Sequence, residues 1–213
     1  MDRNPNIDTW KLDVSGCGLE EFAAWTEYGD LEVLDLSDNN LVELPGWLWK
    51  GRMRKLRELR ARGNKLEAFV NGMLRGTNET NLALLDLRDN AIAQLPYEIM
   101  NVESEKTTLL IDGNPCAEEL DWSGLGVDRL PVRMVEEGYD NGGWEESLKR
   151  VRLAHNMLGE SVFGELVAAN FTNIEELDVG WNRLMGLPEL HIGELGMLRR
   201  LDVSGHAEGI KTE

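Results

Sequence analysis

The 213-residue sequence has few of the features that mark extracellular or membrane proteins. Its two cysteines, Cys17 and Cys116, are too few for a disulfide framework. No apolar run approaches the roughly 20 residues of a membrane-spanning helix. The first residues are polar and lack the apolar segment of a signal peptide. We therefore expect a cytoplasmic protein with reduced cysteines that does not enter a membrane.

Positive charge is also scarce in this chain. It has 22 Lys and Arg against 39 Asp and Glu, which gives a net charge of −17. Because nucleic acids and anionic membrane surfaces are negative themselves, the charge disfavours both as partners. The apolar fraction of 42% is large enough for a hydrophobic core, so the chain should fold.

Motifs of catalysis and metal binding are missing as well. The sequence has no H-E-x-x-H, no P-loop, no G-x-S-x-G and no cysteine pairs with zinc spacing. Residues 140–142 resemble the middle of a calcium loop, but the remaining ligands are absent. The histidines at 155, 191 and 206 share no ligand-like spacing. We therefore predict a protein that is not an enzyme and that needs no cofactor or metal.

A leucine pattern repeats through most of the chain. Residues 31–45 read LEVLDLSDNNLVELP and fit L-x-x-L-x-L-x-x-N-x-L-x-x-L-P at every defined position. The alternation in Leu34-Asp35-Leu36 has a period of two, which indicates a strand and not a helix. Full or weaker copies of the pattern lie at residues 12–17, 56–66, 82–96, 109–114, 148–158, 174–188 and 198–206.

Each copy has a residue in the asparagine position, and this position recurs every 22–26 residues apart from one step of 42. The pattern resembles the leucine-rich repeat family. The resemblance implies an α/β solenoid, or horseshoe, with a parallel β-sheet on the concave face and short helices or irregular turns on the convex face. The Leu-Pro endings are similar to those of intracellular scaffold repeats of the Ras-group-related kind.

The asparagine position should form a structural ladder. A side-chain amide can satisfy the backbone groups that each turn leaves unpaired, and such groups cost roughly 1–3 kcal/mol when buried without a partner. Cysteine should still pack in this position, and a structural role is expected for it more than a reactive thiol. The predicted ladder consists of Cys17, Asn39, Asn64, Asn90, Asn114, Asn156 and Asn182.

Two related halves are expected within one repeat domain of residues 1–213. Residues 12–19 and 120–127 are identical at five of eight positions, so we predict halves at about 10–116 and 117–206. The short spacing before the second of these segments predicts a compressed coil. The glycine-containing segment at about 132–147 is interpreted as an outward excursion.

The exposed residues of the concave strands are the candidate binding site. Residues 50–65 hold eight of the 22 basic residues. Their arginines could pair with Asp35, Asp86 and Asp38 across the sheet, or they could anchor an acidic segment of a partner. The candidate partner-binding residues are Arg57, Arg60, Arg62, Arg88, Lys149, Arg150, Arg152, His155 and Trp181.

Trp181 has two open interpretations. It stands two residues after a strand, where it could contact a partner at the concave rim or pack beside Gly180 and Gly205. The function predicted for the chain is a non-catalytic protein–protein interaction module, a scaffold or signalling adaptor that is itself monomeric. The alternative is a regulatory or sensor domain of a larger enzyme, such as a kinase or GTPase.

Overall fold

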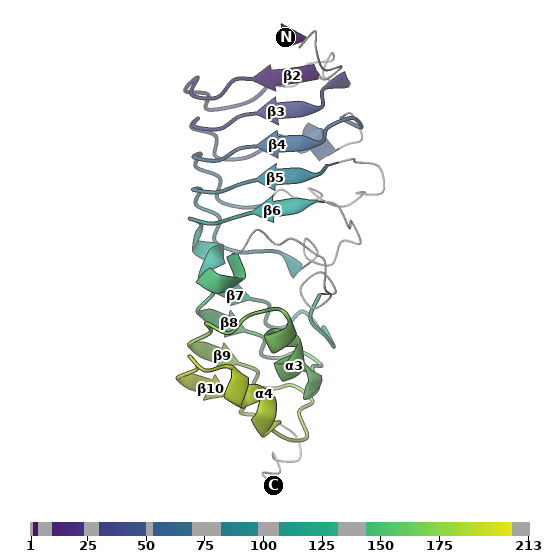
Figure 1. The fold of residues 1–213 in the computed structure, drawn as a ribbon, viewed down its shortest axis with the longest axis vertical. Helices are drawn as coiled ribbons and strands as arrows, with labels where there is room; N and C mark the ends of the chain where they lie inside the picture. Colours follow the sequence, from purple (N-terminus) through teal and green to yellow (C-terminus); the bar gives the residue numbers. More distant parts are fainter. Residues whose placement is uncertain are drawn as a thin grey trace. The chain divides into compact units, whose positions relative to one another are not determined.

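The computed structural model shows a parallel strand in each repeat, as the leucine alternation predicts (Figure 1). The residues it describes are 2–3, 10–23, 30–49, 53–69, 82–97, 107–131 and 144–205. The strands are β1 (Asp2–Arg3), β2 (Trp10–Asp13), β3 (Val33–Asp35), β4 (Glu58–Arg60), β5 (Leu84–Asp86), β6 (Thr108–Leu110), β7 (Glu119–Asp121), β8 (Arg150–Arg152), β9 (Glu176–Asp178) and β10 (Arg200–Asp202).

The described residues fall into two compact units. Unit 1 comprises those up to Ala93 together with residues 107–115, and unit 2 comprises residues 94–97, 116–131 and 144–205. Each unit has a sheet of its own. The prediction of one domain with halves at about 10–116 and 117–206 stays a prediction, and most of the expected excursion, residues 132–143, lies outside the described residues.

Unit 1 contains the sheet β1-β2-β3-β4-β5-β6. Its strands β2 to β6 are parallel, and β1 pairs antiparallel with β2. The middle residue of each of the strands β3 to β6 is a leucine that faces the core, while its two neighbours face the other way. We call that other side the exposed sheet face. Aligned core leucines are Leu34, Leu59, Leu85 and Leu109, each at most 2% exposed.

Unit 2 contains the parallel sheet β7-β8-β9-β10. Its core row consists of Leu120, Val151 and Leu177, with Leu201 at the β10 end. Trp122 is also buried, and its indole N–H donates to the Leu95 carbonyl at 2.6 Å. Strand β7 is therefore a regular strand at the edge of the second sheet, although its repeat starts only a short distance along the chain after the preceding repeat.

The return segments between strands are short helices and turns. The 3-10 helices are η2 (Gly46–Trp49), η4 (Pro115–Ala117) and η5 (Trp144–Ser147), and the α-helices are α3 (Ser161–Ala168) and α4 (Glu189–Glu194). Helix α3 turns Val162, Phe163 and Leu166 into the core of unit 2, because positions three to four residues apart share one helix face. Mixed helices and irregular turns are what the resemblance implies for the convex side.

Candidate binding face

The asparagine of each coil ties two coils together. The side chain of Asn64 accepts a hydrogen bond from the Leu41 N–H at 3.0 Å and donates to the carbonyls of Leu36 and Ala61 at 2.9 and 3.0 Å. One amide therefore satisfies backbone groups from its own coil and from the preceding one. The same bridging contacts recur at Asn39, Asn90, Asn114, Asn156 and Asn182.

Cys17 differs from the asparagines with which it aligns. It is exposed instead of packed, and its thiol reaches only the Ser15 carbonyl of its own turn, at 3.5 Å. A thiol has one weak donor and cannot replace an amide. Asn39 of the next coil makes the regular ladder contacts to Val14 and Leu19 of the first coil. Cys116, by contrast, is buried, and burial raises its pKa to about 12.

The aspartates at the strand ends have a local structural role. Each carboxylate accepts a hydrogen bond from the backbone N–H two residues later, at 2.9–3.2 Å. At Asp13 the hydroxyl of Ser15, followed by Lys11, lowers the carboxyl pKa to about 2. Their recurrence is therefore explained by the turn that follows each strand. The aspartates are Asp13, Asp35, Asp86, Asp121, Asp178 and Asp202.

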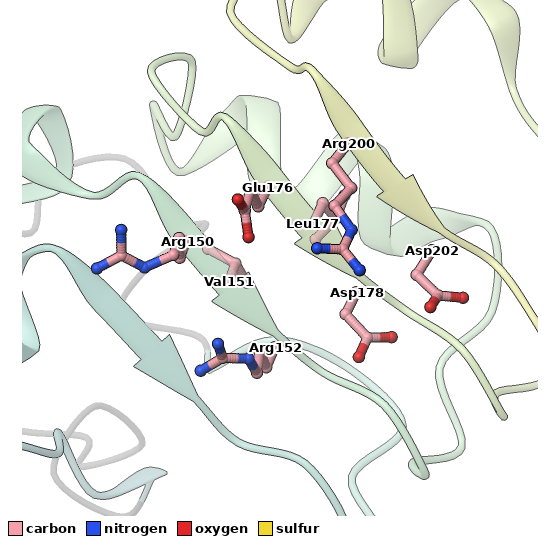
Figure 2. A pocket seen from close by; sticks show the side chains of 8 residues that line it. All are labelled: Arg150, Val151, Arg152, Glu176, Leu177, Asp178, Arg200 and Asp202. Atoms are coloured by element: carbon pink, nitrogen blue, oxygen red, sulfur yellow. The ribbon is translucent and has the colours of Figure 1, made fainter.

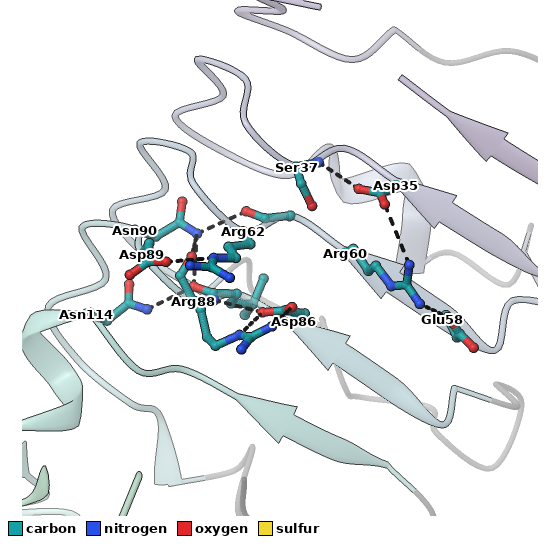
Figure 3. Close-up of polar contacts among 12 residues, drawn as sticks. Asp35, Ser37, Glu58, Arg60, Arg62, Asp86, Arg88, Asp89, Asn90 and Asn114 are labelled. Carbon is teal, nitrogen blue, oxygen red and sulfur yellow. Dashed lines mark hydrogen bonds and ion pairs between the residues drawn. The ribbon is translucent and has the colours of Figure 1, made fainter. Parts of the chain in front are cut away.

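The arginines of unit 1 are paired with acids on the exposed sheet face (Figure 3). Arg60 contacts Glu58 at 2.7 Å and Asp35 at 3.8 Å. The Arg88 guanidinium donates hydrogen bonds to both carboxylate oxygens of Asp86, at 2.9 and 2.7 Å. Burial would raise the pKa of Asp86, but its hydrogen bonds from Arg88 outweigh this, and the pKa is lowered.

Two further arginines of this unit also have acidic partners. Arg62 donates to Asp89 at 2.7 Å, and Arg57 lies 3.9 Å from Glu32. Asp38 was the expected partner of Arg62, but its carboxylate instead occupies the space above Gly63. Of the two interpretations of the basic segment, internal pairing is the one that these contacts favour.

The basic residues of unit 2 surround one carboxylate. Arg150 donates to Glu119 at 3.1 Å, and Arg152 pairs with the same side chain. Lys149 is exposed beside them. Glu119 was not predicted as the partner, although the register places it directly opposite Arg150, so alignment of the repeats could have found it.

His155 and Trp181 are brought together. Their rings stack with centroids 5.5 Å apart and an interplanar angle of 11°. Trp181 also lies over Gly205, and yet it remains 58% exposed. The ring therefore packs on a neighbouring glycine and still presents a large apolar surface, and its contact with a partner stays a prediction.

A hollow of about 150 Å³ opens on the exposed sheet face of β8, β9 and β10 (Figure 2). Two rows of charged side chains border it. Arg150, Glu176 and Arg200 align in one row, and Arg152, Asp178 and Asp202 align in the other. Sequence reasoning missed Glu176 and Arg200 as site residues, but their shared repeat position with Arg150 would have identified them.

Comparison with known proteins agrees with the repeat pattern. The model of the Leucine Rich Repeat family matches residues 30–50. No curated protein matches the sequence. Human 5T4 (Wnt-activated inhibitory factor 1, trophoblast glycoprotein) is a solved structure with 18% identity, covering 91% of this chain and 76% of its own, with a TM-score of 0.41.

Two other solved structures share similarly low identity. The leucine-rich repeat domain of APL1B is 18% identical over 92% of this chain and 68% of its own, with a TM-score of 0.46. The Toll–Spatzle complex of Drosophila contains a chain 21% identical over 90% of this chain and 26% of its own, with a TM-score of 0.44.

The class of the protein follows from its own geometry together with the family match. One parallel strand per coil, a leucine core and an asparagine ladder define the leucine-rich repeat fold. Both units of the chain have this fold. Within the described residues, no helix has the length and apolar character needed to cross a membrane, and no group of three His, Cys, Asp or Glu side chains could hold a metal ion.

Proposed function

We propose that this protein is a non-catalytic module that binds a protein partner through the exposed sheet faces. The observation that carries the proposal is a row of exposed polar and aromatic side chains that project from strands held rigidly by the asparagine ladder. A preorganised surface loses little conformational freedom on binding, which favours recognition. The proposed faces include Arg57, Arg60, Arg62 and Arg88 in unit 1, and Lys149, Arg150, Arg152, His155 and Trp181 in unit 2.

The paired arginines define what such a partner meets. Exposed ion pairs contribute little affinity but set the orientation of a partner and the rate of encounter. The Leu-Pro type of repeat, a scaffold or signalling role, the cytoplasm and a monomeric state belong to the same proposal. The proposal does not include nucleic acids or membranes as partners, because the net charge of −17 repels both.

Site-specific photo-crosslinking tests the proposal. A benzophenone amino acid replaces Arg57 in unit 1 or Lys149 in unit 2, and in the control it replaces Glu194, which is exposed in helix α4. The variants are irradiated in cells that normally make the protein, and the adducts are identified by mass spectrometry. We expect protein adducts from position 57 or 149 and none in common with position 194. Equal adducts from all three positions would contradict a specific sheet-face interaction.

A further inference from the structure

The residue directly before each ladder residue, and before Leu125 and His206 at the equivalent repeat position, is here called the turn position and adopts a left-handed backbone in every described coil. The φ angles lie between 53° and 77°. Glycine accepts this conformation without strain and aspartate tolerates it, whereas it is an outlier for a bulky side chain. The turn positions are Gly16, Asp38, Gly63, Asp89 and Gly113 in unit 1, and Gly124, His155, Trp181 and Gly205 in unit 2.

Trp181 is therefore an unexpected residue for its place. Its φ is 55°, and a Cβ added to Gly205 would lie only 2.3 Å from the indole ring. Gly205 leaves the space in which the ring lies, and His155 stacks on the ring. The turn would form more easily with glycine, so the tryptophan does not serve the turn itself. What it supplies is an exposed aromatic surface, which we call the aromatic shelf, made of His155 and Trp181.

The residues next to the shelf are small. The position before the turn holds Ala154 and Gly180, both buried, and Ser204 in the following coil. No long side chain from this position separates the shelf from the charged row that borders the hollow. In unit 1 the corresponding position holds Ser15, Ser37 and Asp112, but also Arg62 and Arg88, which form ion pairs on the sheet face.

Charge decides which kind of partner fits the hollow. Glu119 already binds Arg150 and Arg152. Arg200 stands next to Glu176 in the register. Asp178 and Asp202 are neighbours in the row on the shelf side, and among the described residues neither has a cation within ion-pair distance. Arg200 also acts on Asp202 through its charge, but it forms no ion pair with it, so the two carboxylates on the shelf side remain accessible to a cation from a partner.

The net charge of the whole chain acts in the same direction. At −17, the protein attracts basic partners over distances of about a Debye length and repels acidic ones. A basic partner segment differs from the acidic segment that the sequence leaves open as an alternative. The arginines that suggested such a segment are largely neutralised by neighbouring carboxylates.

We propose that the aromatic shelf and the adjacent hollow bind an extended segment of a protein partner in which a lysine or arginine stands beside a large apolar side chain. The cation lies against Asp178 and Asp202, and the apolar side chain lies against the exposed part of Trp181. Aromatic side chains of this kind commonly dominate binding at interfaces. This inference rests on the proposed function and names the partner chemistry at unit 2.

A random 12-residue peptide library displayed on phage and selected on the full chain tests the inference. The peptides that are enriched should carry Lys or Arg next to Trp, Phe, Leu or Met. Affinities of synthetic copies are then measured by fluorescence anisotropy. Trp181→Gly should weaken binding at least tenfold. The double variant Asp178→Asn, Asp202→Asn should weaken it about fivefold and should reduce its dependence on salt.

Matched variants separate the site from general effects. Asp121→Asn removes a carboxylate from the same repeat position, beside a glycine turn and away from the shelf, and Val42→Ala removes an exposed apolar side chain from unit 1. Neither should change affinity by more than twofold. Melting temperatures of all variants show whether each has kept its fold, and glycine at position 181 suits the left-handed backbone.

Three results would overturn the inference: enrichment of acidic peptides, enrichment of no sequence, or unchanged affinity after Trp181→Gly. The crosslinking experiment distinguishes this failure from failure of the proposed function. Partner adducts at position 57 or 149 would support the proposed function even if the peptide selection contradicts a basic partner segment. Absence of adducts at both positions would remove the proposed function itself.

Discussion

Units 1 and 2 have the same asparagine ladder and nevertheless present different surfaces. In unit 1, arginines before the turn pair with aspartates, as Arg62 does with Asp89. In unit 2 the corresponding positions are small, and the turns hold His155 and Trp181. The backbone is alike in both, so a repeat can hold its fold constant while the residues around one turn decide whether the surface is neutralised or left open to a partner.

The two cysteines provide the largest expected contrast. Cys17 in unit 1 is exposed, while Cys116 in unit 2 is buried with its pKa raised to about 12. Since only the thiolate reacts, we expect Cys17 to be alkylated at pH 8 at least ~1000-fold faster than Cys116 in the native protein. Mass spectrometry of iodoacetamide-treated protein, with and without urea, measures this. Rapid double labelling without urea would show that the core around Cys116 opens readily.

A ladder asparagine should contribute more to the stability of the fold than the cysteine that occupies the same repeat position in the first coil. Asn90→Ala leaves the Leu66 N–H and the carbonyls of Ala61 and Leu87 without their partner. We expect a loss of about 1–3 kcal/mol in the free energy of unfolding. Cys17→Ala should change it by less than about 0.5 kcal/mol, because Cys17 bonds only its own turn. Urea midpoints of the two variants compare them, and equal midpoints would contradict the ladder's role in stability.

Two glycines of nearly equal φ can separate backbone strain from crowding. Gly113 and Gly124 have φ of 74° and 71°. A Cβ at Gly113 would lie 3.2 Å from backbone atoms of Asp89, whereas a Cβ at Gly124 would meet nothing within 4 Å. Alanine should cost about 1 kcal/mol at position 124 and about 2 kcal/mol at position 113. Thermal unfolding of both variants measures the difference, and a reversed order would mean that the coil of Gly113 relaxes.

The smallest expected effect is the dependence of stability on acidic pH. The pKa of Asp86 is lowered from 3.8 in the folded state, so this group stabilises the fold above its unfolded pKa and loses that contribution as the pH falls below about 3.8. Asp86→Asn should cost about 1 kcal/mol at pH 7 and less at pH 3. Asp178→Asn, which breaks no ion pair, should cost less than about 0.5 kcal/mol at pH 7. Urea titrations at both pH values test this, and a loss for Asp86→Asn that does not change with pH would exclude the ion pair as its cause.

The core was predictable from sequence for a local reason. Leu34 and Leu36 alternate with Asp35, and this period of two fixes which side chains face inward in every copy. The asparagine position could also be found, because its amide serves the turn that follows the strand. The exposure of Cys17 was not predicted from its repeat position, where the asparagines of the other coils are packed; its thiol reaches the Ser15 carbonyl of its own turn.

The sequence by itself determined the repeat, its strands, the leucine core and the positions of the ladder, because each follows from short-range periodicity. Only the tertiary structure decided which acid each arginine binds and which aromatic side chain stays exposed. Arg62 pairs with Asp89 of the following coil, while the carboxylate of Asp38 lies over Gly63. Trp181 is 58% exposed, and its ring contacts His155 and lies over Gly205, residues about 25 positions away on either side along the chain.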